Sequence, residues 1–470
     1  MTYSLTFCNL SIIKKTKVKN FRFTLKLPIL LIIINWKLKS LQFHINNYTV
    51  LRQFRYLKVI ALLFCCILLR AQNMFPGAEG FGSHSRGAYG GDTLPEIIRV
   101  TTLKDGGPGS LRSAIYKNYP RVIVFEVSGV IELNRTLRIR DPYVFIAGQT
   151  APYPGVTLKN FSLGISTHDV LVQGLKIRPG SFSGRQIDGV NIADDSTKLH
   201  NIIIDHCSVS WALDENIGIL NGGNGVTVSH CIISECLNAM NHSCGMLATS
   251  TGQVSIIKNL FIHNEDRNPL VSGDTKEALV ANNLIYNSDT HVIYFGSMSE
   301  LRRKMRAAAI NNYYYPGIKN RNEYIISINA GINPQAQLYL RGNKTEHVTD
   351  TNAWSNKYIH NPANMSLKAN DIPYKLPVVN ILSTTHLKDY LIENCGAQPG
   401  NRDDIDERII NDLVNYSGSK ILYPEEVGGW MYDSQHHILV IPENPHKDDD
   451  NDGFTNLENW VHEMLYNGAQ

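Results

Sequence analysis

The sequence predicts an all-β protein built as a right-handed parallel β-helix, a solenoid with an N-terminal cap and a C-terminal tail that packs on the helix. Three observations support this fold class: a short apolar unit recurs along the chain, each unit is rich in β-branched residues, and hairpin turns are scarce. Recurrence every 20 to 50 residues or so is typical of solenoids, in which each repeat buries its apolar face against its neighbours.

The repeated unit is an alternating apolar run, a polar or glycine corner and a second apolar run. It occupies residues 170–177, 202–209, 226–233, 254–261 and 278–285, and more weakly 306–313 and 337–343. Short β-branched runs without helical periodicity predict strands. Unequal intervals of 24 to 31 residues between units predict loops of variable length, measured between the aligned corner residues His206, His230, Lys258, Asn282, Asn311 and Gly342.

Asparagines follow the corner on four successive units, at Asn259, Asn283, Asn312 and Asn343. We expect their amides to stack as a ladder inside the bend, because each amide can both donate and accept. A β-sandwich, the alternative, needs tight hairpin turns between most strands. Within the repeat region the Asn-Gly type occurs only at residues 221–222 and 224–225, in one loop. The sequence therefore favours the solenoid.

The chain divides into three expected parts. Residues 1–73 hold an upstream extension and a signal peptide, residues 74–350 the β-helix domain, and residues 351–470 a C-terminal extension. The apolar run 59–69 follows three basic residues and ends in Arg70-Ala71-Gln72, as secretory signal peptides do. It is shorter than the roughly 20 residues of a membrane span. We expect a mature chain that is secreted, periplasmic or at the cell surface, without stable membrane insertion; an N-terminal membrane anchor is the alternative.

A solenoid needs its open end covered, and the N-terminal flanking sequence fits that task. Residues 75–112 are glycine-rich and finish in a helix start at Ser110. In the tail, residues 402–414 read as an amphipathic helix with apolar positions 405, 409, 410 and 413, and residues 457–465 read as a second helix. We expect this tail to pack along the solenoid.

Composition excludes some classes of function. The formal charge of +3 and the lack of a dense Lys/Arg stripe beyond the N-terminus give no reason to expect a nucleic-acid partner. We expect a monomer. Beyond residue 73 the odd number of irregularly spaced cysteines is a poor disulfide framework and predicts free buried thiols at Cys207, Cys231, Cys236, Cys244 and Cys395.

Acidic residues recur ahead of the corners. Asp188 lies 18 residues before His206, and Asp214 lies 16 before His230, so their carboxylates are expected to converge on successive coils. Converging carboxylates repel unless a cation or a proton separates them, and hard oxygen ligands favour Ca²⁺. The alternative is that these are ordinary turn-capping aspartates.

Several motifs, in this order within a β-helix repeat, resemble the pectate lyase family (polysaccharide lyase family one). The similarity spans roughly residues 75 to 345. It is carried by Phe75-Pro-Gly-Ala-Glu-Gly-Phe-Gly, Gly109-Ser-Leu-Arg112, Asp188-Gly-Val, Ile204-Asp-His-Cys-Ser-Val-Ser-Trp211, Asp214-Glu215, Val226-Thr-Val-Ser-His230 and Arg267-Asn-Pro269.

The resemblance implies a secreted lyase that cleaves pectate or a related uronate polymer by calcium-assisted β-elimination. Such an enzyme has an acidic polysaccharide as its partner and Ca²⁺ as its cofactor. Carried onto this chain, Arg267 is the catalytic proton acceptor, Asp188 and Asp214 are calcium ligands, and Glu215 is a further ligand. Asp205 and His206 match a motif that orders the coil.

This chain departs from the family pattern at three places. Ser272 stands where a second arginine is common, and Gly218 where an acid is expected. A substrate-binding lysine is expected near His242 and is missing there. We assign substrate binding to His242. Arginine is also an unusual base, because its pKa exceeds about 12. From the residues alone, Arg267 reads as a clamp for a substrate carboxylate or as the partner of Glu265 or Asp266.

Two other functions remain open at this stage. A polygalacturonase-type β-helix glycoside hydrolase would use paired carboxylates, such as Asp188 with Asp194 and Asp195. Its Gly-His-Gly element is missing, since His230 follows a serine and precedes a cysteine. The other is a non-catalytic carbohydrate-binding β-helix.

Near the C-terminus, an acidic loop has the D-x-D-x-D-G spacing of calcium loops. Its expected ligands are Asp448, Asp450 and Asp452, and Gly453 permits the sharp turn. Glu458 falls at position 11 of the loop, which disfavours an EF-hand. A small structural calcium loop and a solvated acidic turn are the two interpretations.

Overall fold

The computed structural model describes residues 73–194, 199–297, 303–317, 324–329, 331–346, 348, 350, 352–362 and 366–467. These residues belong to one compact unit, Ala71–Gln470. The expected upstream extension and signal peptide lie outside the described residues, apart from Asn73. Within the described part of the chain, no helix combines the length and apolar character needed to cross a bilayer.

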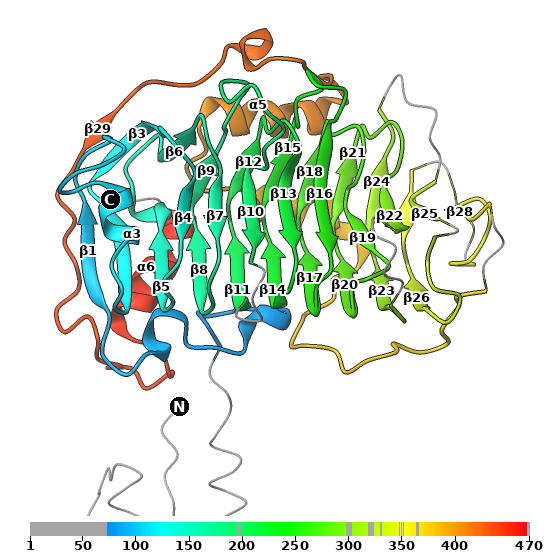
Figure 1. Ribbon diagram of the computed structural model, residues 1–470, viewed down its shortest axis with the longest axis horizontal. Helices are drawn as coiled ribbons and strands as arrows, with labels where there is room; N and C mark the ends of the chain where they lie inside the picture. Colours follow the sequence, from blue (N-terminus) through cyan, green and yellow to red (C-terminus); the bar gives the residue numbers. More distant parts are fainter. Residues whose placement is uncertain are drawn as a thin grey trace, which may run out of the picture. The chain divides into compact units, whose positions relative to one another are not determined.

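Three parallel sheets wind around one axis, and each coil contributes one strand to each sheet (Figure 1). Sheet A consists of β1 (Glu96–Val100), β2 (Arg121–Phe125), β5 (Val144–Ala147), β8 (Val170–Gln173), β11 (His200–Asp205), β14 (Asn224–Ser229), β17 (Gln253–Ile257), β20 (Glu277–Ala281), β23 (Arg306–Ile310) and β26 (Gln337–Arg341). The predicted parallel β-solenoid is confirmed.

The other two sheets have shorter strands. Sheet B consists of β3 (Val127–Glu132), β6 (Val156–Lys159), β9 (Leu175–Ile177), β12 (Ser208–Ser210), β15 (Ile232–Ser234), β18 (Leu260–Ile262), β21 (Leu284–Tyr286), β24 (Tyr313–Tyr315) and β27 (Lys344–Thr345), with β29 (Gln435–His436) antiparallel beside β3. Sheet C consists of β4 (Leu137–Ile139), β7 (Leu163–Ile165), β10 (Val190–Ala193), β13 (Glu215–Leu220), β16 (Cys244–Thr249), β19 (Leu270–Ser272), β22 (Ile293–Gly296), β25 (Ile326–Ile328) and β28 (Ile359–His360).

The corner between sheets A and B explains the sequence repeat. Every aligned corner residue has a left-handed backbone, with φ between 45° at His206 and 63° at Gly342. The asparagine ladder is also confirmed. Asn283 Oδ1 accepts from the backbone N–H and the amide of Asn259, both at 3.0 Å, and Asn312 and Asn343 repeat the arrangement on the next coils. The ladder keeps buried polar groups satisfied at each bend.

Strand residues alternate between the interior and a covered exterior. Ile202 and Ile204 of β11 face the apolar interior, whereas Ile203 faces a cluster made by the cap and the tail. Both faces of sheet A are therefore buried, and its strands read as continuous apolar runs. The five expected free cysteines are all buried and unpaired: Cys207, Cys231, Cys236, Cys244 and Cys395.

The N-terminal cap contains the 3-10 helices η1 (Phe81–Ser83) and η2 (Gly87–Gly90) and the helix α3 (Leu111–Ile115). Ser110 caps α3, as the sequence predicts, and its hydroxyl accepts from the backbone N–H of Ser113 at 3.2 Å. Another 3-10 helix, η3 (Gly148–Thr150), follows β5.

The tail runs along the solenoid, as expected (Figure 1). Its helices are η4 (Thr384–His386), α4 (Leu387–Asn394), α5 (Asp404–Asn415), η5 (Pro424–Val427) and α6 (Asn456–Asn467). Helices α4 and α5 pack on sheet B, and α6 packs on sheet A. A buried ion pair anchors α5, because Arg178 of the solenoid binds Asp403 and Asp406, each at 2.6 Å.

Candidate active site

The loops that lead from sheet B into sheet C carry the predicted site residues. Asp188 precedes β10, Asp214 precedes β13, His242 precedes β16 and Arg267 precedes β19. These four strands are consecutive neighbours in sheet C. Because parallel strands on successive coils start at the same edge of a sheet, residues far apart in the sequence meet there.

Arg267 points toward a row of polar side chains from the two preceding coils. Its Nη1 donates to Oε1 of Glu215 and lies 3.4 Å from Nε2 of His242. His242 Nε2 lies 2.8 Å from Oδ1 of Asp214 and 3.7 Å from Oε1 of Glu215. The structure therefore places Arg267, Glu215, His242 and Asp214 in one connected cluster of charges.

Hydrogen bonding sets the charge states in this cluster. The bond to Asp214, followed by contacts with Cys244 and Glu215, raises the pKa of His242 to about 12, while the same His242 contact lowers the pKa of Asp214. Burial alone would lower the pKa of Arg267, but electrostatic interactions with Cys244 and with Glu215, which accepts a hydrogen bond from the guanidinium, outweigh burial and raise this pKa. Two cations thus face the loop edge of sheet C.

Asp188 is different because, among the residues that the structure describes, no cation forms an ion pair with it. Its carboxylate is buried and accepts from the Asn191 amide at 2.7 Å and from the Glu215 backbone N–H at 3.3 Å. Burial, followed by the charge of Glu215, raises the pKa of Asp188 to about 8. A buried carboxylate next to other carboxylates favours either a proton or a bound cation.

Asp266 and His291 fix the backbone of Arg267 through hydrogen bonds. Arg267 has a left-handed φ of 56°, and its N–H donates to Oδ1 of Asp266 at 2.8 Å. The same oxygen accepts from His291 Nδ1 at 3.0 Å. Burial raises the pKa of Asp266, but the His291 contacts outweigh it, so the pKa is lowered. The guanidinium of Arg267 pairs with Glu215. The prediction that Glu265 or Asp266 is the partner of this guanidinium is therefore wrong.

An open cavity of about 210 Å³ lies beside Arg267. Arg267 and His242 line it together with polar and acidic residues: Asn238, Asn241, Ser243, Cys244, Glu265, Asp266 and Thr290. The cavity thus combines two cationic side chains with groups that hydrogen-bond, a lining suited to an anionic, hydroxylated ligand.

Comparison with known proteins decides the family. No family model matches the chain. The chain is 32% identical over 376 residues to "Probable pectate lyase C" of Emericella nidulans, covering 79% of this chain and 83% of that protein. It is 31% identical over 383 residues to the protein of the same name from Aspergillus flavus, covering 78% and 84%. The chain belongs to the pectate lyase family.

A solved structure supports the same fold. The structure of Jun a 1, the major allergen from cedar pollen, matches with a TM-score of 0.50 and 18% identity, covering 68% of this chain and 92% of that one. The resemblance to the pectate lyase family is confirmed, and the enzyme is a pectate lyase-like polysaccharide lyase. The hydrolase and the non-catalytic binder are set aside; Asp195, which the hydrolase would use, lies outside the described residues.

The structure gives a reason for two departures of this pectate lyase family member. A Cβ on Gly218 would stand 2.4 Å from Oδ2 of Asp188, so the Asp188 carboxylate occupies the space of the expected acid. Ser272 is fully buried on β19 and hydrogen-bonds the carboxylate of Asp274. No lysine lies near His242 in the sequence, but His242 itself supplies a positive charge beside Arg267, because its pKa is raised.

Several residues that support this cluster are not expected from the sequence. Asn191 and His291 have no motif of their own, and the sequence predicts only a free buried thiol at Cys244. The position of Asn191 three residues after Asp188 is an available signal, because Asp188 lies two residues before β10 and Asn191 is the second residue of that strand. His291 lies 25 residues after Asp266, within the range of the repeat.

The C-terminal acidic loop lies apart from this cluster. The ligand atoms of Asp448, Asp450 and Asp452 lie within 4.8 Å of one another, and all three residues are exposed. Glu458 turns away, because its carboxylate pairs with Arg86 and accepts from the backbone N–H of Thr455. A calcium loop at these three aspartates stays a prediction.

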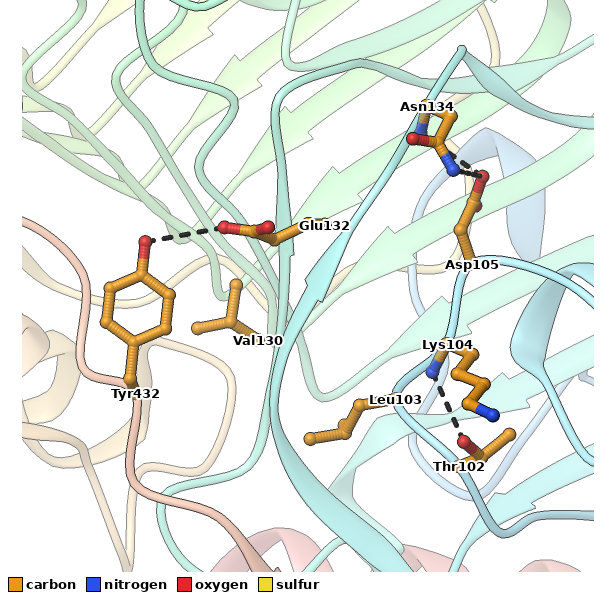
Figure 2. A pocket seen from close by; sticks show the side chains of 8 residues that line it. All are labelled: Thr102, Leu103, Lys104, Asp105, Val130, Glu132, Asn134 and Tyr432. Carbon is orange, nitrogen blue, oxygen red and sulfur yellow. Dashed lines mark hydrogen bonds between the residues drawn. The ribbon is translucent and has the colours of Figure 1, made fainter.

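A larger cavity of about 550 Å³ lies at the N-terminal end of the solenoid (Figure 2). Its two carboxylates are both committed to other groups. Asp105 pairs with Arg112 at 2.6 Å, and Glu132 pairs with Lys159 at 2.7 Å. This cavity lacks the converging carboxylates found at the edge of sheet C, so we assign it no part in the chemistry.

Proposed function

We propose that this enzyme cleaves pectate or a related uronate polymer by calcium-assisted β-elimination, with Arg267 as the proton acceptor. One observation carries the proposal: Arg267 and His242 face a cavity beside a group of three carboxylates on consecutive coils. Cations that face the cavity suit a polymer with a carboxylate on each sugar.

The carboxylates fit a calcium ion. Ligand oxygens of Asp188, Asp214 and Glu215 lie within 4.8 Å of one another, and within the described part of the chain Asp188 forms no ion pair with a cation. Oxygen-only donors of this kind suit Ca²⁺, which takes six to eight oxygens at about 2.3–2.6 Å. A bound Ca²⁺ would neutralise the uronate carboxylate and make the neighbouring C5 proton more acidic.

In the elimination, the proton leaves C5 of the uronate and the glycosidic oxygen leaves from C4, which produces an unsaturated sugar end. Two hydrogen bonds position Arg267 for the first step: its guanidinium donates to Glu215, and its backbone N–H donates to the carboxylate of Asp266. While Glu215 pairs with it, the raised pKa of Arg267 keeps the guanidinium protonated. Proton acceptance therefore requires this ion pair to loosen when substrate is bound.

His242 supplies positive charge where related enzymes have a lysine. Its imidazole is protonated around neutral pH because its pKa is raised to about 12. It lines the same cavity as Arg267. We assign it to the binding of a substrate carboxylate, which the protonated ring can hold by a charge-assisted hydrogen bond.

The remaining assignments belong to the same proposal. Residues 74–350 form the lyase domain, and residues 351–470 form an extension that covers it. The enzyme acts as a monomer outside the cytoplasm, where its polymeric substrate is accessible. Asp448, Asp450 and Asp452 form a separate structural calcium site.

The test uses polygalacturonate as substrate. We expect an ultraviolet-absorbing unsaturated product that forms with Ca²⁺ and disappears in excess chelator. Reducing ends without that chromophore would indicate hydrolysis, and binding without either product would indicate a non-catalytic protein. Activity that persists in chelator would contradict the calcium assignment while leaving the lyase assignment intact.

A further inference from the structure

A second group of ligating side chains lies on the other side of the coil. His168 and Asp169 lie in the turn between β7 and β8, and His200 is the first residue of β11, so all three lie where sheet C leads into sheet A. The loops of the proposed catalytic site lead from sheet B into sheet C. We propose that these three residues form a binding site for a transition-metal ion such as Zn²⁺. The proposal is independent of the catalytic assignment.

Strand register brings the two histidines together. Strands β8 and β11 pair with Val170 opposite Ile202, so positions 168 and 200, each two residues earlier, lie opposite each other. The two rings are stacked, with centroids 4.5 Å apart and planes 8° apart. The sequence gives no sign of this, because the two residues are 32 positions apart.

Both histidines present a nitrogen to the same carboxylate oxygen. His168 Nδ1 lies 2.6 Å and His200 Nε2 lies 3.8 Å from Oδ2 of Asp169. All three ligand atoms lie within 4.8 Å of one another. Zinc at about 2.0–2.2 Å from each ligand requires ligand atoms roughly 3–3.5 Å apart. The two observed separations bracket that range, so small side-chain rotations suffice.

The carboxylate is already oriented for this role. The other oxygen of Asp169, Oδ1, accepts from the Ser85 hydroxyl and from the Asn201 amide at 3.1 Å. These two donors leave Oδ2 directed at the histidines, as outer hydrogen bonds do in many metal sites. Ser85 belongs to the N-terminal cap, so an ion here would join the cap to two successive coils.

The ligand chemistry selects the class of metal. Two imidazoles and one carboxylate favour zinc and its neighbours, whereas Ca²⁺ prefers oxygen ligands alone. The site is open to solvent, since 41% of the His200 side chain and 24% of the His168 side chain are exposed. The competing explanation is a pair of histidines that share protons with Asp169 and bind no ion.

The test measures binding of Zn²⁺ to the metal-stripped full chain by calorimetry, with saturating Ca²⁺ present to occupy all-oxygen sites. We expect one tight equivalent of zinc, which His168→Gln and His200→Gln each remove. His436→Gln, an exposed histidine on β29, is the matched control and keeps the equivalent. His242→Gln also keeps it, which separates this site from the Glu215, His242 and Cys244 group.

Two further measurements guard against misfolded variants. Zinc is expected to raise the Tm of the parent protein and of His436→Gln but not that of His200→Gln. Asn201→Gly removes the hydrogen bond to Asp169 and tolerates the left-handed φ of 53° at this position, and it is expected to weaken zinc binding by about 10- to 100-fold. The proposal is overturned if the parent binds no zinc, or if both His168→Gln and His200→Gln bind it as the parent does.

Discussion

The guanidinium of Arg267 donates to the carboxylate of Glu215, which lies 52 residues earlier and two coils away. Both side chains are largely buried, with 14% of Arg267 and 4% of Glu215 exposed. The pair joins the expected base to the expected calcium ligands. It therefore links two coils at this edge of sheet C, where the proposed active site lies.

Removing the carboxylate of this pair should destabilise the enzyme. Glu215→Gln leaves a buried guanidinium without its counter-charge, so we expect a loss of roughly 3 kcal/mol in the free energy of unfolding. Urea denaturation measures it. The control is Glu132→Gln, whose partner is Lys159 and whose side chain is 55% exposed; that variant should lose no more than about 1 kcal/mol. Equal losses in the two variants would contradict the prediction.

Arg267→Lys should abolish most of the elimination. A general base contributes about 10²- to 10⁴-fold, and a lysine places its nitrogen differently and cannot reproduce the planar guanidinium. The initial rate of unsaturated product formation tests this. Arg306→Lys, which changes an arginine paired with Glu277 on sheet A, should keep full activity. If Arg267→Lys retains the parental rate while Asp188→Ala does not, the base is another group.

The pH dependence of stability should report Asp188. Its pKa is raised to about 8 by burial and by Glu215, whereas an unfolded aspartate titrates near 4. The folded state then binds the proton more tightly, so the associated stability is full below about pH 4 and is lost as pH rises toward 8. In chelator, the free energy of unfolding should fall between pH 5 and pH 8, and Ca²⁺ should restore it most at pH 8.

Two variants check the origin of this fall. Asp188→Asn should flatten it, because the amide does not titrate. Asp274 is a control of opposite sign: burial raises its pKa, but hydrogen bonds from Ser250 outweigh it and the pKa is lowered. Its contribution is lost only as pH falls toward its lowered pKa, so Asp274→Asn should leave the slope between pH 5 and 8 unchanged. If the free energy of unfolding of Asp188→Asn still falls between pH 5 and pH 8, Asp188 is not the group that causes the fall.

His242→Gln should weaken substrate binding more than catalysis. Loss of a hydrogen bond to a charged group costs about 1.5–3 kcal/mol, which corresponds to a rise in KM of roughly 10- to 100-fold. Steady-state kinetics with polygalacturonate separate KM from kcat. His242→Lys should recover most of the affinity, and His360→Gln, an exposed histidine on β28, should change neither constant. A purely structural role for His242 predicts no recovery by lysine.

The asparagine ladder should be a major source of stability. Asn283→Ala removes the acceptor of two hydrogen bonds from Asn259 and the amide that donates to Ile256 O, while Asn312 Oδ1 keeps the backbone N–H of residue 283 as its donor. Buried polar groups without partners cost about 1–3 kcal/mol each, so we expect a loss of at least 3 kcal/mol by urea denaturation. Asn329→Ala, at an exposed position, is the control and should change stability by less than about 0.5 kcal/mol.

The sequence by itself determines the repeating architecture of this protein and indicates its family. The repeat of apolar runs and corners specifies strands, bends and their stacking, because burial of alternate side chains and satisfaction of backbone groups are local, periodic requirements. The ladder at Asn259 and its neighbours, the cap at Ser110 and the amphipathic face of α5 follow from the same reasoning. The order of the motifs around Asp188 and Arg267 was enough to indicate the family.

Only the tertiary structure decided which side chains meet. Arg267 pairs with Glu215 instead of its sequence neighbour Asp266, and His168 stacks on His200, because loop lengths and strand register set the positions of side chains across coils. Asp188 has a raised pKa for the same reason, since its surroundings come from the next coil. Contacts between coils depend on several loops of unequal length at once, and no local pattern in the chain records them.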